Sequence, residues 1–179
     1  AVSLEAHTAD VVKQMRQFTD SLGLAEELRQ ALEIAAECHD WGKRREHWQR
    51  MIGNPQPSDW LANPSGKMRP LPIRDHYRHE LGSLVDVQGH AGFRDLSEPM
   101  KDLVMHLIAA HHGRARPHFF PDEIIDPGSQ ALNVSDIAIG IPSRFARLQK
   151  SYGRWGLAWL ESLLRAADYA ASAEPGESI

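Results

Sequence analysis

The sequence has few of the features that would assign it to a specialised class of protein. It contains a single cysteine, Cys38, so it cannot form an internal disulfide bond. No apolar run approaches the about eighteen residues of a membrane span, and no signal peptide is evident. The net charge of −4 differs from the strongly basic character typical of nucleic-acid-binding domains. A disulfide-stapled scaffold and a membrane protein are therefore excluded, and we expect a reducing, cytoplasmic setting.

The remaining composition is that of an ordinary globular protein. Hydrophobic residues make up 42% of the chain and charged residues 25%. At roughly 150 residues per domain, the 179 residues predict one domain spanning residues 1–179. Because the chain starts at Ala1 rather than at an initiator methionine, we expect it to have been excised from a longer polypeptide or processed.

Apolar residues recur mainly at helical spacing, and no convincing pair of strands is evident. The pattern predicts helices over residues 4–22, 24–52, 76–88, 97–112, 143–152 and 154–171. Two long segments that contain several prolines, residues 53–75 and 113–142, are predicted to be loops. The predicted fold class is all-α.

The run His39-Asp40-Trp41-Gly42-Lys43 carries the first candidate site residues. On a helix, Lys43 would lie one turn beyond His39 and Asp40 and face the same region. Glycine costs about 1 kcal/mol in a helix, so Gly42 indicates close approach of another backbone or of a substrate. The alternative is a surface helix with an Asp40–Lys43 ion pair.

Other predicted helices contribute further metal-ligand side chains. The pair His111-His112 ends an apolar helix, where its alternative role is to cap the last carbonyl groups. His7, His79 and Asp168 each lie on a separate predicted helix. Imidazole and carboxylate without thiolate suit Mn, Fe, Co, Ni or Zn. Seven such ligands suit two ions that share a carboxylate, which is the usual apparatus for hydrolysing phosphate esters.

This pattern resembles the HD superfamily of metal-dependent phosphohydrolases. More narrowly, His39-Asp40-x-Gly42-Lys43, His79-Glu80 and His111-His112 resemble the HD nuclease domain of the CRISPR-associated helicase–nuclease of type I interference systems. The resemblance extends from His7 to Asp168. It implies an all-α HD-domain helical bundle with two long loops near the metal site, and a domain excised from, or partnered with, a helicase.

The resemblance also implies roles for individual residues. One divalent ion would be held by His7, His39, Asp40 and Asp168, and the second by His79, His111 and His112, with Asp40 as the bridge. The ions would be Mn, Fe, Co or Ni, with Zn as a further candidate. Asp40 and Lys43 would be catalytic: water activated by two metals attacks phosphorus, and Lys43 stabilises the phosphate charge. The substrate would be single-stranded DNA, delivered by the helicase after a guide-RNA surveillance complex opens the target.

Candidate substrate contacts lie close to these ligands in the sequence. Eight basic residues against three acidic ones lie between Trp41 and Arg78. Arg114 and Arg116 follow the histidine pair, and we include His47 and His76 as candidate substrate-binding residues. Two other functions remain open at this point. One is a phosphohydrolase acting on a nucleotide or cyclic dinucleotide, and the other is a non-catalytic, metal-stabilised docking module.

Overall fold

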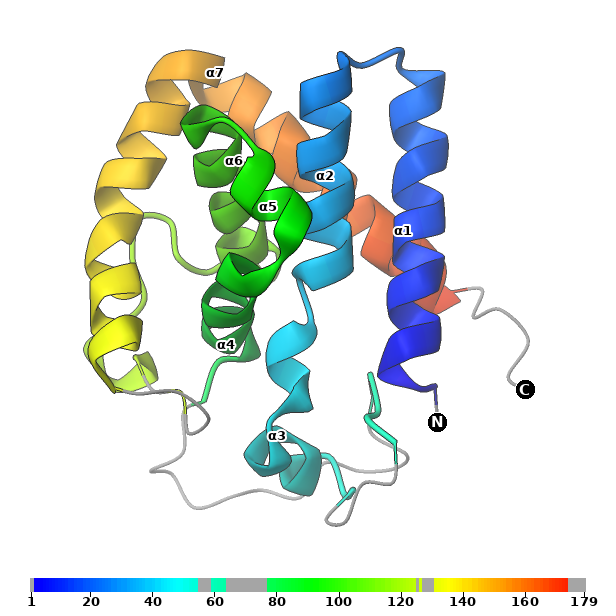
Figure 1. The fold of residues 1–179 in the computed structure, drawn as a ribbon, viewed down its shortest axis with the longest axis vertical. Helices are drawn as coiled ribbons and strands as arrows, with labels where there is room; N and C mark the ends of the chain where they lie inside the picture. The colour runs from blue at the N-terminus through cyan, green and yellow to red at the C-terminus, as the bar shows by residue number, and fades with distance from the viewer. Residues whose placement is uncertain (1, 55–58, 64–76, 125, 127–130, 174–179) are drawn as a thin grey trace.

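The protein, seen in a computed structural model, is a bundle of helices (Figure 1). The structure describes residues 2–54, 59–63, 77–124, 126 and 131–173. Its helices, with 3₁₀ turns written η, are α1 (Leu4–Ser21), α2 (Glu26–Cys38), η1 (Trp41–Arg44), α3 (Glu46–Met51), α4 (His79–Asp86), η2 (Val87–Gly89), α5 (Ala91–Asp95), α6 (Glu98–Ala110), η3 (Pro121–Glu123) and α7 (Ala131–Ala173). Within these ranges the β pairing is a single bridge between Ser3 and Leu61. The all-α prediction is confirmed, and no helix of the described part is long and apolar enough to cross a membrane.

Helices α1 and α2 form an antiparallel pair (Figure 1). The hydroxyl of Ser3 accepts a hydrogen bond from the Ala6 backbone N–H at 3.1 Å and so caps α1. Gly23 lies between the two helices with a φ of 60°, a left-handed conformation that glycine adopts without strain. The predicted helices over 4–22 and 97–112 are confirmed as α1 and α6, and Ser97 is the N-cap of α6.

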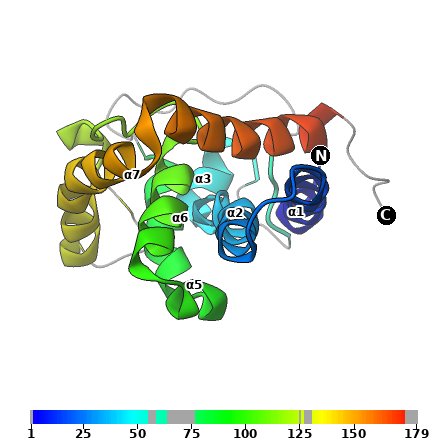
Figure 2. The ribbon, with the colours of Figure 1, turned by 90° about the horizontal axis from the view of Figure 1, so that it is seen from above.

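Helix α7 changes direction at Gly153, where φ is 67° and ψ is 172°. Its second half then crosses α1 and α2 on one side of the bundle, while its first half lies beside α6 (Figures 1 and 2). Side chains from α1, α2, α4, α6 and α7 share one core, which includes Met15, Leu32, Leu84, Leu107, Ile108 and Leu164. The break at Gly153 agrees with the gap between the predicted helices 143–152 and 154–171.

The predicted loop over 113–142 is wrong in its second half, because α7 already begins at Ala131. Val134, Ile137, Ala138 and Ile141 are buried and follow helical spacing. This apolar stripe outweighs the loss of one backbone hydrogen bond at Pro142, which lies inside the helix. Most of the predicted loop over 53–75 lies outside the described residues.

The predicted helix over 24–52 is also wrong, because α2 ends at Cys38 and is followed by η1 and α3. The break leaves His39 as the C-cap of α2 and places Asp40 outside regular helix, with φ of −106° and ψ of 6°. The short α5 was not anticipated either. Helix α2 ends at its C-cap His39 because of contacts with the neighbouring helix α4, which are part of the candidate site.

Candidate metal centre

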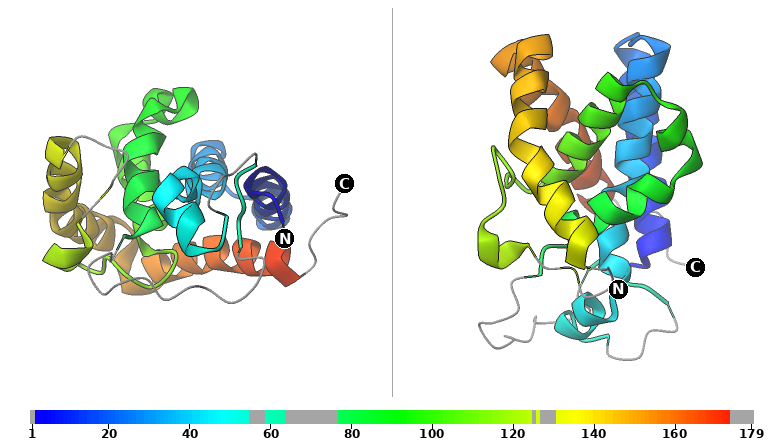
Figure 3. Two further views of the ribbon diagram at one scale, coloured as in Figure 1. Left: turned by 90° about the horizontal axis from the view of Figure 1, so that it is seen from below. Right: turned by 60° about the vertical axis from the view of Figure 1, so that its left-hand side comes forward.

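Seven predicted ligand side chains come together where five helices meet. His7 projects from α1, His39 and Asp40 follow α2, His79 begins α4, His111 and His112 follow α6, and Asp168 lies on α7. Seen from below, the lower ends of α1 and α2 lie against the second half of α7 (Figure 3). Possible ligand atoms form two groups, each within 4.8 Å: Asp40, His79, His111 and His112 in one, and His7, His39 and Asp168 in the other.

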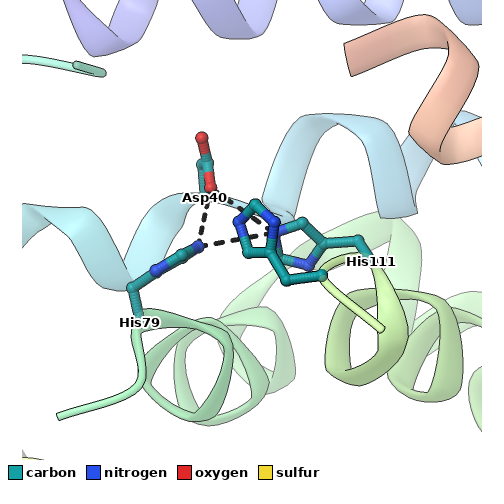
Figure 4. A group of neighbouring side chains, drawn as sticks. Asp40, His79 and His111 are labelled. Atoms are coloured by element: carbon teal, nitrogen blue, oxygen red, sulfur yellow. Dashed lines mark hydrogen bonds and ion pairs between the residues drawn. The ribbon is translucent and has the colours of Figure 1, made fainter. Parts of the chain in front are cut away.

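Asp40 lies between the two groups and directs one carboxylate oxygen toward each. Its Oδ1 lies 3.1 Å from Nε2 of His79 and 3.7 Å from Nε2 of His111 (Figure 4). Its Oδ2 lies 3.4 Å from Nε2 of His39 and 3.8 Å from Nε2 of His7. The same oxygen accepts an ion pair from Nζ of Lys43 at 2.6 Å. The carboxylate is therefore shaped to serve two adjacent positions.

The imidazole rings of two histidines are oriented by the helix ends on which they lie. The Nδ1 of His39 lies 2.7 Å from the carbonyl oxygen of Ala36, and the Nδ1 of His111 lies 2.6 Å from that of Ile108. A carbonyl can only accept, so each Nδ1 carries the proton and each neutral ring presents a lone pair at Nε2.

These lone pairs face oxygen atoms, and the site has buried polar atoms that remain unsatisfied. In the described part of the chain, Nε2 of His39 and Oδ1 of Asp40 have no hydrogen-bond partner. The Nε2 atoms of His79 and His111 face each other at 3.4 Å. Electron pairs converging in a buried space need a cation between them. The donor set of imidazole and carboxylate groups fits a divalent transition-metal ion.

The electrostatics of the site keep two key groups in the protonation states that bind metal. Burial lowers the pKa of His39 to about 4, so its ring is neutral at pH 7. Burial alone would raise the pKa of Asp40, but its contacts with the surrounding imidazole rings and the ammonium group of Lys43 outweigh it and hold the pKa well below its usual range. For His111, burial lowers the pKa, but the contacts with Asp40 more than offset it and leave the pKa raised.

Helix α4 and η1 approach so closely that only glycine fits between them. A Cβ atom on Gly42 would lie 2.0 Å from the carbonyl oxygen of His79. Ser83 accepts a hydrogen bond from the Gly42 N–H at 2.8 Å and donates one to the His39 carbonyl at 2.7 Å. Tyr77 donates its hydroxyl to the Gly42 carbonyl at 2.7 Å. These bonds satisfy backbone groups that a continuous helix would have used, and they fix the spacing between His39-Asp40 and His79.

The sequence did predict that Gly42 marks a close approach, and the partner is the backbone of α4. The roles of Ser83 and Tyr77 were missed, because nothing in their local sequence relates them to a residue about forty positions away. Glu80 was noted only as a neighbour of His79. Its side chain is 1% exposed beside the site.

The open side of the site is marked by its more exposed ligands. His112 is exposed and His79 and Asp168 are partly exposed, whereas His39 and Asp40 are buried to 1% exposure or less. A molecule from the solvent would therefore reach the site past His112, His79 and Asp168.

Most basic residues of the 41–78 run that the structure describes are engaged with acidic side chains. Arg45 binds both Asp86 and Asp126, Arg78 pairs with Glu123, and Lys43 pairs with Asp40. Lys67, Arg69 and Arg74 lie outside the described residues. Two of these ion pairs, Arg45–Asp126 and Arg78–Glu123, attach the segment after His112 to the ends of η1 and α4.

The candidate substrate-binding residues have different surroundings. Arg114 is exposed just beyond His112. Arg116 forms an ion pair with the buried Glu161 at 2.7 Å, and Glu161 also contacts His106 at 2.7 Å. His47 is half-buried on α3, with its ring 6.2 Å from that of Tyr77. His76 lies outside the described residues.

Comparison with known proteins agrees with this geometry. Comparisons with curated proteins and with solved structures gave no significant match. The model of the family described as "Cas3, HD domain" matches residues 1–174, nearly the whole chain. Members of this family are metal-dependent HD hydrolases of CRISPR systems. The helical bundle brings His39-Asp40 and five further predicted ligand side chains together, as this family match leads one to expect. This chain therefore belongs to the Cas3 HD domain family.

Proposed function

We propose that the chain is a metal-dependent nuclease that cuts single-stranded DNA in CRISPR interference, using two divalent ions. The observation that carries this proposal is the placement of Asp40, whose two oxygens face two separate groups of ligand atoms. Family membership supports hydrolase chemistry, and the geometry supports its two-ion form.

We assign the ligands by these two groups. His7, His39 and Asp168 would hold one ion, and His79, His111 and His112 the other, with Asp40 shared between them. The ions would be Mn, Fe, Co or Ni, with Zn as an alternative. Bound divalent ions supply Lewis acidity, which lowers the pKa of water and neutralises charge on the phosphate.

The side chains around the ions have separate tasks. Lys43 is 7% exposed and holds its ammonium group against Asp40, so it keeps this carboxylate charged and adds positive charge where negative charge develops on the phosphate. The buried ligands His39 and His111 have Nδ1 fixed by backbone carbonyls, so their Nε2 atoms need no reorientation to bind.

A single strand suits the surroundings of the site. Arg114 is exposed beyond His112 and is placed to contact a backbone phosphate next to the reacting one. The other basic side chains near the site are largely paired with acids, which favours a weak grip on a strand that another module delivers. We therefore propose that residues 1–179 are one nuclease domain that acts in the cytoplasm with a fused or separate helicase and a guide-RNA surveillance complex.

Cleavage of circular single-stranded DNA with added Mn²⁺ tests this function. Wild type and the control Asp136→Ala, which removes an exposed carboxylate of α7, should both linearise the circle. Asp40→Ala should lose at least one ion and nearly all cleavage. Hydrolysis of free nucleotides or cyclic dinucleotides without DNA cleavage would instead establish the small-substrate phosphohydrolase. Bound metal without turnover on any of these substrates would indicate the docking module.

A further inference from the structure

Glu80 is a buried carboxylate in the first turn of α4, next to the predicted ligand His79. Its side chain is 1% exposed, and both oxygens lack a hydrogen-bond partner among the residues that the structure describes. Burying such a group without a partner is costly, so an acidic residue at this position requires a specific reason. The ring of His79 faces this carboxylate, with Oε2 3.6 Å from Nδ1.

The other buried ligands show what a ring of this kind needs. A metal-binding histidine usually donates its second ring N–H to an acceptor, which fixes the tautomer and the direction of the ring. His39 and His111 both follow the last turn of a helix, where carbonyl oxygens remain free. They use the carbonyl three residues earlier, on Ala36 and Ile108.

His79 is the first residue of α4, so no earlier turn of that helix offers it a carbonyl as α2 and α6 offer one to His39 and His111. A helix start presents free N–H groups and no free carbonyl of a preceding turn. The Nε2 of His79 faces Oδ1 of Asp40 at 3.1 Å, so a metal ion bound to Nε2 would leave the ring proton on Nδ1, which then needs an acceptor. The facing carboxylate is that of Glu80.

We propose that Glu80 is a positioning residue that accepts the Nδ1–H of His79 and thereby keeps the Nε2 lone pair directed at the metal position shared with His111. The separation of 3.6 Å is a few tenths of an ångström longer than a hydrogen bond, and a small rotation of the ring closes it. The effect on affinity rests on the proposed function, since it requires an ion at this position. The effect on the tautomer does not.

Nitrogen-15 NMR of the histidine rings in the metal-free protein gives the first test. Asp40 competes for the ring proton at Nε2, so the test is the difference between the two proteins: Glu80→Leu should have a smaller fraction of His79 protonated at Nδ1 than wild type. In a titration with Mn²⁺ alone, Glu80→Leu should weaken one of two sites by about 10–100-fold and leave the other unchanged. The control Glu33→Leu removes a glutamate that pairs with Arg16 away from the site and should bind like wild type.

Thermal stability separates positioning from a structural role. Because Glu80 is buried without a hydrogen-bond partner in the described part of the chain, Glu80→Leu should melt at or above the wild-type temperature despite its weaker Mn²⁺ binding. If that variant does not fold, Glu80→Gln keeps an oxygen acceptor without its charge and should retain the Nδ1–H tautomer with a smaller loss of affinity.

Two results would overturn the proposal. One is a fraction of Nδ1-protonated His79 that Glu80→Leu leaves unchanged, and the other is Glu80→Leu binding Mn²⁺ as wild type does. A wild type that binds no Mn²⁺, but whose Nδ1–H fraction falls in Glu80→Leu, contradicts the proposed function and still supports the role of Glu80 in setting the tautomer.

Discussion

Replacing Gly42 by alanine should damage the site through the backbone alone, without removing any ligand. The new Cβ would lie 2.0 Å from the His79 carbonyl oxygen and 2.8 Å from the Ser83 backbone nitrogen. Ordinary contact begins at 3.4 Å, so η1 and α4 would have to separate by about 1.4 Å. Both partners are backbone atoms of packed helices and cannot rotate away.

The magnitude of the effect follows from that displacement. Overpacking of this kind typically costs about 1–3 kcal/mol, which lowers the melting temperature of a domain of this size by about 2–12 °C. The displacement also separates Asp40 from His79, whose facing atoms lie 3.1 Å apart. Metal ligands tolerate only about 0.2 Å, and a misplacement of about 1 Å can cost about 10²-fold in rate.

Differential scanning calorimetry, Mn²⁺ titration and DNA cleavage measure these effects. Gly42→Ala should melt earlier, bind Mn²⁺ more weakly and cut at least about 10²-fold more slowly. Gly89→Ala is the matched control, because a Cβ there would meet nothing within 4 Å. A Gly42→Ala protein that melts and binds Mn²⁺ as wild type does would refute the close contact between η1 and α4.

Three further predictions concern the surroundings of the site. Ser83→Ala leaves the buried Gly42 N–H and His39 carbonyl without their hydrogen-bond partner, so chemical denaturation should show a free energy of unfolding lower by about 1–3 kcal/mol. The control Ser162→Ala, at an exposed position, should not lower it. Equal free energies of unfolding for the two variants would contradict the role of Ser83. Burial lowers the pKa of His111, but its contacts with Asp40 raise it more, so the pKa lies above its ordinary value of 6.5 and the ring must lose a proton to bind metal. Mn²⁺ affinity and cleavage should therefore already fall as the pH drops to 6.5, while His39, with a pKa of about 4, stays neutral. Calorimetry showing constant affinity from about pH 8 to about pH 5 would oppose this. Arg114→Ala should reduce the salt dependence of single-stranded DNA binding by about one counterion and leave the melting temperature unchanged. Arg116→Ala should lower the melting temperature, because Glu161 loses its ion pair with this arginine. The opposite pattern would exchange the roles of the two arginines.

The sequence predicted the helices whose apolar stripes are long and uninterrupted. Helix α6 was found with its N-terminal boundary because Ser97 precedes its apolar stripe, and the end of α1 was found because Gly23 follows it. The end of helix α2 at Cys38 was not predictable in the same way. The composition around Cys38 favours a continuous helix. That helix is interrupted by the contact of Gly42 with α4 and by the hydrogen bonds of Ser83 and Tyr77. Propensity gave the wrong result where packing between distant segments decided the backbone.

The candidate site was predictable as a set of residue types, although not as a geometry. Imidazole and carboxylate groups on separate helices indicated a shared centre, and the structure brings His7 and Asp168 together across nearly the whole chain, 3.0 Å apart. The sequence could not show that the two carboxylate oxygens of Asp40 face different groups of predicted ligands, nor that Arg116 pairs with Glu161. Both depend on where helices cross, which no local pattern encodes.

The central claim is that Asp40 bridges two divalent ions, and electron paramagnetic resonance of the Mn²⁺-loaded protein tests it most directly. A carboxylate shared by two Mn²⁺ ions couples their spins, so wild type should bind two ions per chain and show the spectrum of an exchange-coupled pair. Asp40→Ala should lose at least one ion and the coupling. A wild type that binds a single ion, or two ions whose spectra are independent, would contradict the account.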